Sequence, residues 1–372
     1  MAGDARAQQG KACDQSAPHM NRNSARRFFI TPSLKITGGN LEIIRLAREL
    51  SDQGVKTGLI AMWRAPHEAD TGALPIIRLS DAIISPRTVV TQLPSVARRF
   101  RRLMATGVAA VVFSHYVTFA LSWLVPRSAR WFFVQDTEWL FVHGATKQAV
   151  LKRFILSALR SGKVISANRY LSRQMQNNDV PVACEALIWA DPLFTSNREA
   201  VRDIDVAVML RRGAHKRADL TLSLIDELVS QSPGVKIAAI SPDGTYRAAI
   251  SPAVQYLERA SIDDMRSLYE RTKIFVLLSD HEGFGLPPLE AMGAGCVPVC
   301  RDAGGINSYM TGELSANVVT PEMPIRDISG TVLQLLHDKA RHRDLSKAAR
   351  ATFLQGQKAA TERLAALLAA GF

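Results

Sequence analysis

The stretch that most limits how this chain can fold is residues 274–305, IFVLLSDHEGFGLPPLEAMGAGCVPVCRDAGG. It begins with a continuous apolar run, Ile274–Leu278, which predicts a strand buried on both faces, as in a parallel sheet. A glycine-containing loop follows, and two prolines then lead into a short predicted helix, Leu289–Met292, because proline suits a first helical turn. A second apolar run, Cys296–Cys300, predicts the next strand. This order of strand, glycine loop, helix and strand is typical of an open α/β sheet.

The loop has the features of an anion-binding site. Ligands of open α/β sheets bind beyond the carboxyl ends of the strands, where a helix start offers unpaired N–H groups and a positive potential to a phosphate. Gly283 and Gly285 have no Cβ, so a ligand can approach the backbone closely. Glu282 and Glu290 also lie here. Carboxylates beside an anion site suggest hydrogen bonds to sugar or ribose hydroxyls, because a carboxylate only accepts.

These two glutamates carry a resemblance to a known family. Their spacing matches the E-x7-E motif of retaining glycosyltransferases with the GT-B fold, above all family 4, and residues 282–292 (EGFGLPPLEAM) and 303–305 (AGG) resemble that family almost letter for letter. The resemblance implies an α/β fold of the GT-B type, with two Rossmann-like doubly wound domains facing a cleft. It implies a nucleotide diphosphate sugar as donor substrate, without a cofactor or a metal ion. The residues it assigns to the donor in this loop are Glu282 for the sugar, Glu290 for the ribose, and Gly283, Phe284, Gly285 and Leu286.

A second glycine loop lies near the start of the chain. A short predicted strand, Phe28–Ile30, is followed by Gly38 and Gly39 and then by an amphipathic helix, Leu41–Leu50. Glycine turns between a strand and a helix are common, so this pattern alone is a weak sign of a phosphate loop. The family resemblance implies that the two glycines face the donor.

Polar residues follow two further predicted strands. His115 comes after Val108–Phe113, and the resemblance implies that it contacts the donor sugar, with the capping of a loop as the alternative. Asp136 and Glu138 come after Trp131–Val134, in a Gln-Asp-x-Glu sequence similar to a rhamnosyltransferase-like branch of the family. They are candidates for orienting an acceptor hydroxyl or for acting as a base. They would equally serve to cap the next helix.

Basic residues follow the predicted strand Val206–Leu210. In the family an arginine and a lysine five positions apart bind the donor diphosphate, and Arg211 and Lys216 have that spacing. Cationic side chains bind a diphosphate well and favour its departure as a leaving group. Arg212 stands next to Arg211, so these two arginines are alternatives for the role.

The length of 372 residues suits two domains of ordinary size. We expect an N-terminal, acceptor-side domain over 28–190 and a C-terminal, nucleotide-sugar domain over 191–345. We expect residues 346–372 to form a helix. One alternative for this helix is that it crosses back to the N-terminal domain. Residues 1–27 are polar and predict a disordered tail without a signal peptide. The four cysteines have no CxxC spacing and indicate reduced residues in a cytosolic protein.

The positive charge is concentrated in the first half of the chain. Residues 1–190 contain 25 Lys and Arg against 12 Asp and Glu, a balance of +13, whereas the whole chain carries +12. Such a surface suits an anionic partner, such as a membrane or a lipid-pyrophosphate-linked acceptor, and no nucleic-acid motif accompanies it. Ser95–Met104 predicts a basic amphipathic helix that either lies on a membrane or packs on its domain. Val108–Val125 predicts a buried strand and then a helix, Val117–Val125, with a transmembrane span as the alternative.

Taken together, the residues and the resemblance predict a metal-independent, retaining glycosyltransferase. It would move a hexose or deoxyhexose to a saccharide or lipid-linked acceptor in cell-surface or exopolysaccharide synthesis, in the cytoplasm or at the inner face of the plasma membrane. The alternative is a catalytically degenerate module that binds a nucleotide sugar or tethers a complex to a membrane. The intact acidic and basic residues argue against that alternative.

Overall fold

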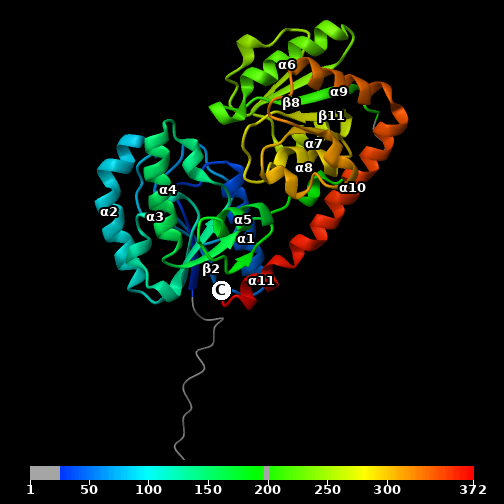
Figure 1. Cartoon of the computed structure of the whole chain (residues 1–372). Coiled ribbons are helices and arrows are strands. Elements are labelled where there is room, and N and C mark those ends of the chain that lie inside the picture. The colour runs from blue at the N-terminus through cyan, green and yellow to red at the C-terminus, as the bar shows by residue number, and fades with distance from the viewer. Residues whose placement is uncertain (1–25, 197–200) are drawn as a thin grey trace, which may run out of the picture.

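The computed structural model describes residues 26–196 and 201–372. These residues form two α/β domains, each built on its own parallel sheet, and the domains lie side by side (Figure 1). The predicted fold class of two Rossmann-like, doubly wound domains is confirmed. Most of the predicted tail, residues 1–25, lies outside the described residues, and Arg26 and Arg27 begin the first strand rather than ending a tail.

The N-terminal sheet has seven parallel strands in the order β3-β2-β1-β4-β5-β6-β7. The order reverses between β1 and β4, and the loops after these two strands therefore open a crevice at the carboxyl edge of the sheet. The strands are β1 (Arg26–Thr31), β2 (Thr57–Ala61), β3 (Ile76–Arg78), β4 (Val108–Phe113), β5 (Arg130–Val134), β6 (Lys163–Ser166) and β7 (Cys184–Glu185).

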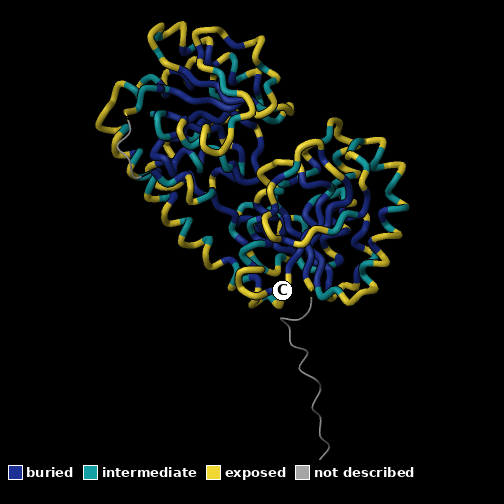
Figure 2. The backbone as a smooth tube through the Cα atoms, turned by 180° about the vertical axis from the view of Figure 1, so that it is seen from behind, coloured by how far each residue is buried: buried dark blue, intermediate teal, exposed yellow. Residues whose placement is uncertain are grey.

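Helices cover this sheet, and their outer turns are exposed to solvent (Figure 2). The basic helix α2 buries Val96 and Phe100 and leaves its arginines outside. The helices are α1 (Gly38–Asp52), α2 (Pro86–Met104), α3 (Tyr116–Phe119), α4 (Ala145–Leu159) and α5 (Arg169–Gln176), with the short 3-10 turns η1 (Ser122–Leu124), η2 (Arg127–Ala129), η3 (Glu138–Phe141) and η4 (Pro192–Phe194).

The C-terminal sheet has six parallel strands in the order β10-β9-β8-β11-β12-β13, and its order reverses between β8 and β11. The strands are β8 (Ile204–Met209), β9 (Ile237–Ser241), β10 (Gln255–Glu258), β11 (Thr272–Leu277), β12 (Val297–Arg301) and β13 (Val318–Val319). The helices around them are α6 (Ala218–Gln231), α7 (Ile262–Arg271), α8 (Leu286–Gly293), α9 (Ile325–His337) and α10 (Lys339–Thr361), with the 3-10 turns η5 (Ala214–Lys216), η6 (Arg247–Ala249), η7 (Gly305–Ser308) and η8 (Gly312–Asn317).

The end of the chain returns to the N-terminal domain. Helix α10 runs along the C-terminal domain, and α11 (Arg363–Ala369) then lies against the other domain, as the red ribbon in Figure 1 shows. The guanidinium of Arg363 is buried and pairs with Glu42 and Glu49 of α1. Phe372 packs on Phe29 and Trp131. Because α1 begins beside the cavity described below, this return anchors a helix that contributes to the site.

The predicted helix over Val117–Val125 is wrong in extent. After the buried strand β4, the chain makes one short helix, α3, and then a 3-10 turn, η1. Val125 is extended because it precedes Pro126, whose ring disfavours a helical conformation at the residue before it. Within residues 26–196 and 201–372, no helix has the length and apolar character needed to cross a membrane.

Candidate active site

A cavity of about 290 Å³ lies between the two domains. Its walls come from the loops that follow β1, β4 and β5 in the N-terminal domain and from the loops that follow β8 and β11 in the C-terminal domain. In each sheet these include both strands at the point where the strand order reverses, which is where open α/β sheets bind ligands. The lining residues are Thr37, Gly38, Gly39, Asn40, Ile43, Ser114, His115, Gln135, Asp136, Glu138, Phe141, Ile188, Arg211, Lys216, Glu282, Gly283, Phe284, Gly285 and Leu286.

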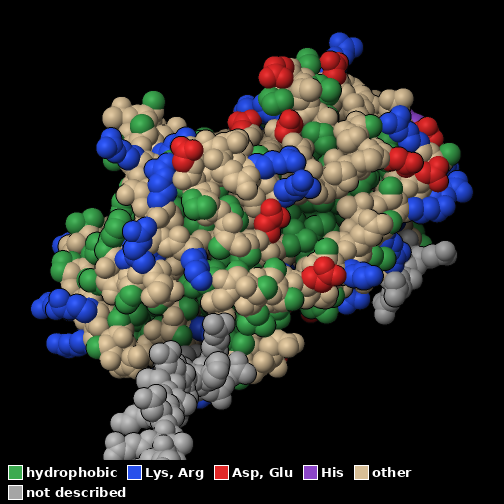
Figure 3. All heavy atoms as spheres, turned by 60° about the horizontal axis from the view of Figure 1, so that its bottom comes forward, with side chains coloured by type: hydrophobic (Ala, Val, Ile, Leu, Met, Phe, Trp, Pro, Cys, Tyr) green, Lys and Arg blue, Asp and Glu red, His purple; other side chains and the backbone are tan. Residues whose placement is uncertain are grey.

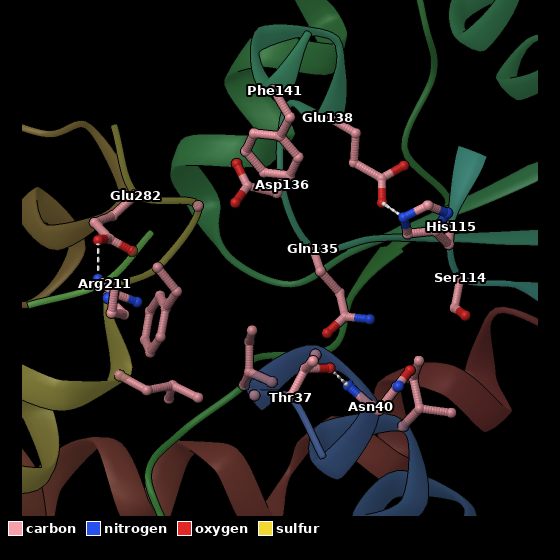
Figure 4. Close-up of a pocket in the computed structure, with 18 of the residues that line it drawn as sticks. Thr37, Asn40, Ser114, His115, Gln135, Asp136, Glu138, Phe141, Arg211 and Glu282 are labelled. Carbon is pink, nitrogen blue, oxygen red and sulfur yellow. Dashed lines mark hydrogen bonds and ion pairs between the residues drawn. The ribbon is translucent and has the colours of Figure 1, made fainter. Parts of the chain in front are cut away.

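The C-terminal wall is charged. Glu282 is only 4% exposed, and its carboxylate accepts a hydrogen bond from the guanidinium of Arg211, as the dashed line in Figure 4 shows. The Lys216 Nζ lies 3.0 Å from the other carboxylate oxygen. Burial alone would raise the pKa of Glu282, but the charges of Arg211 and Lys216 outweigh it and lower that pKa to about 2. Glu282 is therefore ionised at neutral pH.

The structure distinguishes between the two arginines that follow β8. Arg211 lines the cavity, whereas the side chain of Arg212 is 70% exposed and does not line it. Arg212 pairs with Asp243 at 2.9 Å and donates to the Thr245 hydroxyl at 2.6 Å. Of the two alternatives left by the sequence, Arg211 is the one positioned to meet a ligand in the cavity.

The N-terminal wall is uncharged where His115 and Glu138 face each other (Figure 4). The Nδ1 atom of His115 accepts the Val117 N–H at 3.2 Å, so the proton of a neutral ring is on Nε2, which lies 3.7 Å from Glu138 Oε1. Burial lowers the pKa of His115 to about 4. Burial, with the nearby Asp136, raises the pKa of Glu138 to about 8, against the Tyr116 N–H that donates to its carboxyl at 2.7 Å. His115 caps α3, which was the alternative role, and it also lines the cavity, so its contact with the donor sugar stays a prediction.

Gly38 and Gly39 lie in the cavity wall at the start of α1, after the cap residue Thr37. A Cβ on Gly39 would lie 3.3 Å from the Gln135 side-chain oxygen, so the glycine makes room for this glutamine, which also lines the cavity. Asp136 lines the cavity too. One of its carboxylate oxygens lies 2.6 Å from Nε2 of His281, which belongs to the other domain.

The loop after β11 forms the junction of the two walls. Gly283, Phe284, Gly285 and Leu286 all line the cavity. Gly285 has a φ of +81°, which favours glycine, and its carbonyl accepts the Tyr309 O–H at 2.6 Å. The ring of Phe284 is buried and packs on Trp189 and Tyr309, so its main contribution is to support the loop.

Glu290 is not among the lining residues. It lies in α8, and its carboxyl accepts the Tyr269 O–H at 3.3 Å. Burial raises its pKa to about 7. A ligand that extends from the cavity along α8 would be needed to reach it.

Among the described residues, no group of three His, Cys, Asp or Glu side chains is arranged to hold a metal ion. Asp203 and Asp205 form an Asp-x-Asp pair, a pattern that can bind a metal ion, but they are paired with Arg271 and Lys273, each at 2.6 Å. They lie at the start of β8, away from the cavity.

Residues 196–352 match the family described as glycosyl transferases, group 1. The match covers the C-terminal domain, which is called the group 1 domain below because of this similarity. The chain is 30% identical to the serotype-specific mannosyltransferase WbdA of Escherichia coli over 127 residues, which are 32% of this chain and 15% of that protein. It is 28% identical to the GDP-mannose:cellobiosyl-diphosphopolyprenol alpha-mannosyltransferase of Komagataeibacter xylinus over 122 residues, 30% of this chain and 31% of that protein. The matches thus span less than a third of the length of these relatives.

Solved structures resemble more than nine tenths of the chain. The sucrose-phosphate synthase of Thermosynechococcus elongatus superposes with a TM-score of 0.72 at 14% identity and covers 92% of this chain and 100% of its own. HepE of Anabaena, in complex with UDP and glucose, superposes with a TM-score of 0.73 at 14% identity and covers 93% and 99%. At this identity the likeness shows the fold alone, and that fold is the predicted GT-B arrangement.

Several residues that line the cavity beside the group 1 domain were not predicted from the sequence. Asn40 donates to the carbonyls of Ser33 and Lys35 at 2.9 and 2.7 Å and thereby shapes the loop before α1. The sequence feature that could have identified Asn40 as a lining residue is its position directly after Gly38 and Gly39. Phe141 stacks on His215 of the group 1 domain with ring centroids 5.1 Å apart, a pairing across domains that no local sequence pattern reveals.

Proposed function

We propose that this protein is a glycosyltransferase that moves a hexose or deoxyhexose from a nucleotide diphosphate sugar to a saccharide or lipid-linked acceptor. The observation that carries the proposal is the contrast within one cavity. An ionised Glu282 held by two cations faces a wall where His115 and Glu138 are neutral. The first suits a charged, phosphorylated donor and the second a neutral hydroxyl.

The donor diphosphate would bind at Arg211 and Lys216. Both cations pair with Glu282, and both can turn part of their hydrogen bonding toward phosphate oxygens. The N–H groups at the start of α8, near Gly285 and Leu286, add positive potential on the same side. Because these groups neutralise the charge that develops on the leaving diphosphate, we propose that the reaction does not require a metal ion.

The donor sugar would lie against Glu282, which can accept hydrogen bonds from two of its hydroxyls. Gly38 would allow the ring to approach the backbone, whereas the space beside Gly39 and Gly283 is filled by Gln135. Glu290, in the first turns of α8, would hold the ribose. We propose that the anomeric configuration is retained, and the raised pKa of Glu138 supports this. A protonated carboxyl is a poor base, so an oxygen of the departing diphosphate would take the acceptor proton, on the same face as the bond that breaks.

The acceptor would bind along the N-terminal wall, at Glu138, and the neighbouring His115 would contact the donor sugar, as the family resemblance implies. In Figure 3, Lys and Arg side chains spread over the N-terminal domain, on the left of the view, with few acidic ones among them. Such a surface suits a lipid-pyrophosphate acceptor at the anionic inner face of a membrane. This would place the protein in the cytoplasm or at that surface, in the synthesis of a cell-surface polysaccharide.

The relatives suggest which donor to test first. Two of them are named as mannosyltransferases, and the Komagataeibacter xylinus relative is named for GDP-mannose and a diphosphopolyprenol. The test is release of GDP, UDP or dTDP from GDP-mannose, UDP-glucose or dTDP-rhamnose, with polyprenyl-diphosphate saccharides as acceptors, in buffer containing EDTA. The anomeric configuration of the product follows from its NMR coupling constants. The proposal fails if no sugar nucleotide binds, as measured by thermal shift, and none is consumed.

A further inference from the structure

The loop that carries Glu282 is bound by the opposite domain. Nε2 of His281, the residue before Glu282, lies 2.6 Å from Asp136 Oδ1 and 2.9 Å from the Thr137 hydroxyl. A carboxylate only accepts, so Nε2 carries the proton and donates to Asp136. His281 is 8% exposed, and a hydrogen bond to a charged group that is shielded from water is among the stronger ones.

Two further contacts join this loop to the N-terminal domain. Together with the contact of His281 with Asp136 and Thr137, they form what we call the seam between the domains. The side-chain amide of Asn168, after β6, donates to the Gly283 carbonyl at 2.8 Å. A Cβ on Gly283 would lie 2.3 Å from the Gln135 carbonyl, so the two backbones approach as closely as glycine permits. The N-terminal domain thus binds the residues on both sides of Glu282.

The same loop also makes hydrogen bonds inside its own, C-terminal domain. The Glu282 N–H donates to the Ala303 carbonyl at 2.9 Å, and the Gly305 N–H donates to the Glu282 carbonyl at 2.9 Å. These bonds define the backbone of the loop without help from His281. The ring of His281 instead fixes the position of this loop relative to the N-terminal wall of the cavity.

We propose that His281 is a positioning residue, which sets the distance between Glu282 and the acceptor wall by holding Asp136 and Thr137. The inference rests on the proposed function, since it assigns His281 to the alignment of donor and acceptor. It also gives Asp136 a role that the sequence did not indicate. Its carboxylate binds the opposite domain, while Glu138 would face the acceptor.

Loss of this contact has a distinctive consequence. The donor diphosphate would be bound by Arg211 and Lys216 of the C-terminal domain, so nucleotide affinity does not depend on the seam. Transfer does depend on it, because a misplacement of about 1 Å between reacting groups can cost about 100-fold in rate. A residue that merely folded the loop would affect nucleotide binding and transfer together.

The test compares His281→Ala with His281→Gln, whose amide can donate from nearly the position of Nε2. The control is His337→Ala, since His337 is exposed in α9 and far along the chain from the cavity. We expect His281→Ala to lower kcat about tenfold or more and to change the Kd for GDP or UDP less than about twofold. His281→Gln should recover most of the rate. Asp136→Ala should cost little more when it is added to His281→Ala, because both remove one contact.

Hydrogen exchange of the peptide covering residues 279–285 provides a readout that needs no turnover. It should be faster in His281→Ala and near the wild-type rate in His281→Gln. Equal loss of nucleotide affinity and rate, or exchange unchanged in His281→Ala, overturns the inference. If the wild type consumes no sugar nucleotide, the proposed function fails, and the exchange measurement still decides whether the contact holds the loop.

Discussion

Two glutamates face the same cavity and have opposite protonation states. Glu282, on the C-terminal wall, has a pKa of about 2, whereas Glu138, on the N-terminal wall, has a pKa of about 8. Both are largely buried, so burial by itself cannot explain the difference. Glu282 has two cations within hydrogen-bonding reach, and Glu138 has a neutral histidine and one backbone N–H.

Under the proposed function, the difference would let one cavity hold two kinds of substrate. The cations that keep Glu282 ionised are also the groups that would bind a diphosphate, so this wall suits an anionic ligand. On the other wall no charge compensates His115 and Glu138, and burial leaves both of them neutral, whereas Asp136 on the same wall is paired with His281. A neutral wall tolerates a hydroxyl and does not compete with the diphosphate for its cations.

The largest effect should come from removing a cation of the charged wall. Lys216→Ala should lower kcat about 100- to 1000-fold, because one preorganised donor to the developing charge on the leaving group is lost. The measurement is initial rate at saturating donor, with circular dichroism to show that the variant folds. Glu282→Ala should be similarly inactive.

Arg212→Ala is the matched control for this experiment, since Arg212 is exposed and does not line the cavity. Its rate should stay within about threefold of the wild type, as for an ordinary surface substitution. A near-normal rate for Lys216→Ala, or an equal loss in both variants, would mean that the charged wall is not where the diphosphate departs.

The next largest effect should come from forcing the walls apart. Gly283→Ala puts a Cβ 2.3 Å from the Gln135 carbonyl, so the loop must move away from the N-terminal domain. We expect a loss of about 10- to 100-fold in kcat from the misalignment. Gly234→Ala is the control, because a Cβ there meets no atom within 4 Å. Normal turnover by Gly283→Ala would show that the two walls need not approach this closely.

A smaller effect is expected from replacing Glu138, the carboxyl that is protonated at neutral pH. Glutamine resembles a protonated glutamate, so Glu138→Gln should keep its rate within about threefold at pH 7. The wild type should lose activity as pH rises through about 8, where Glu138 ionises, and the variant should lack that step. The pH profile of kcat measures this. An inactive Glu138→Gln at pH 7 would identify Glu138 as an ionised base and remove the contrast between the walls.

The charged wall could largely be predicted from the sequence, because its parts are local. Glu282 and the glycines fall within one loop, and Arg211 and Lys216 within six residues after one strand. The choice between Arg211 and Arg212 could not be made, since it depends on which side chain meets Glu282, about 70 positions away along the chain.

The neutral wall and the seam could be predicted only in part. His115, Asp136 and Glu138 were candidates because each follows a buried strand. Their protonation depends on burial that adjacent elements produce together, and the pairing of Asp136 with His281 joins residues 145 positions apart. The strands β3, β7 and β13 were not predicted, because each has two or three residues and a half-exposed edge position carries little hydrophobic pattern.

The smallest effect concerns stability, and it should have opposite signs on the two walls. The pKa of Glu138 is raised in the folded state, so the wild type should lose stability relative to Glu138→Gln as pH rises from about 4.5 to about 8. The pKa of Glu282 is lowered, so the stability that the wild type holds over Glu282→Gln should be present above pH 4.5 and decline as pH falls toward 2. Each change should be on the order of 1–3 kcal/mol, since one pKa unit corresponds to about 1.4 kcal/mol and part of the shift is screened by water. Urea unfolding at pH 3.5, 5 and 8 measures both, and slopes of the same sign would show that burial, rather than the two cations, governs both carboxyls.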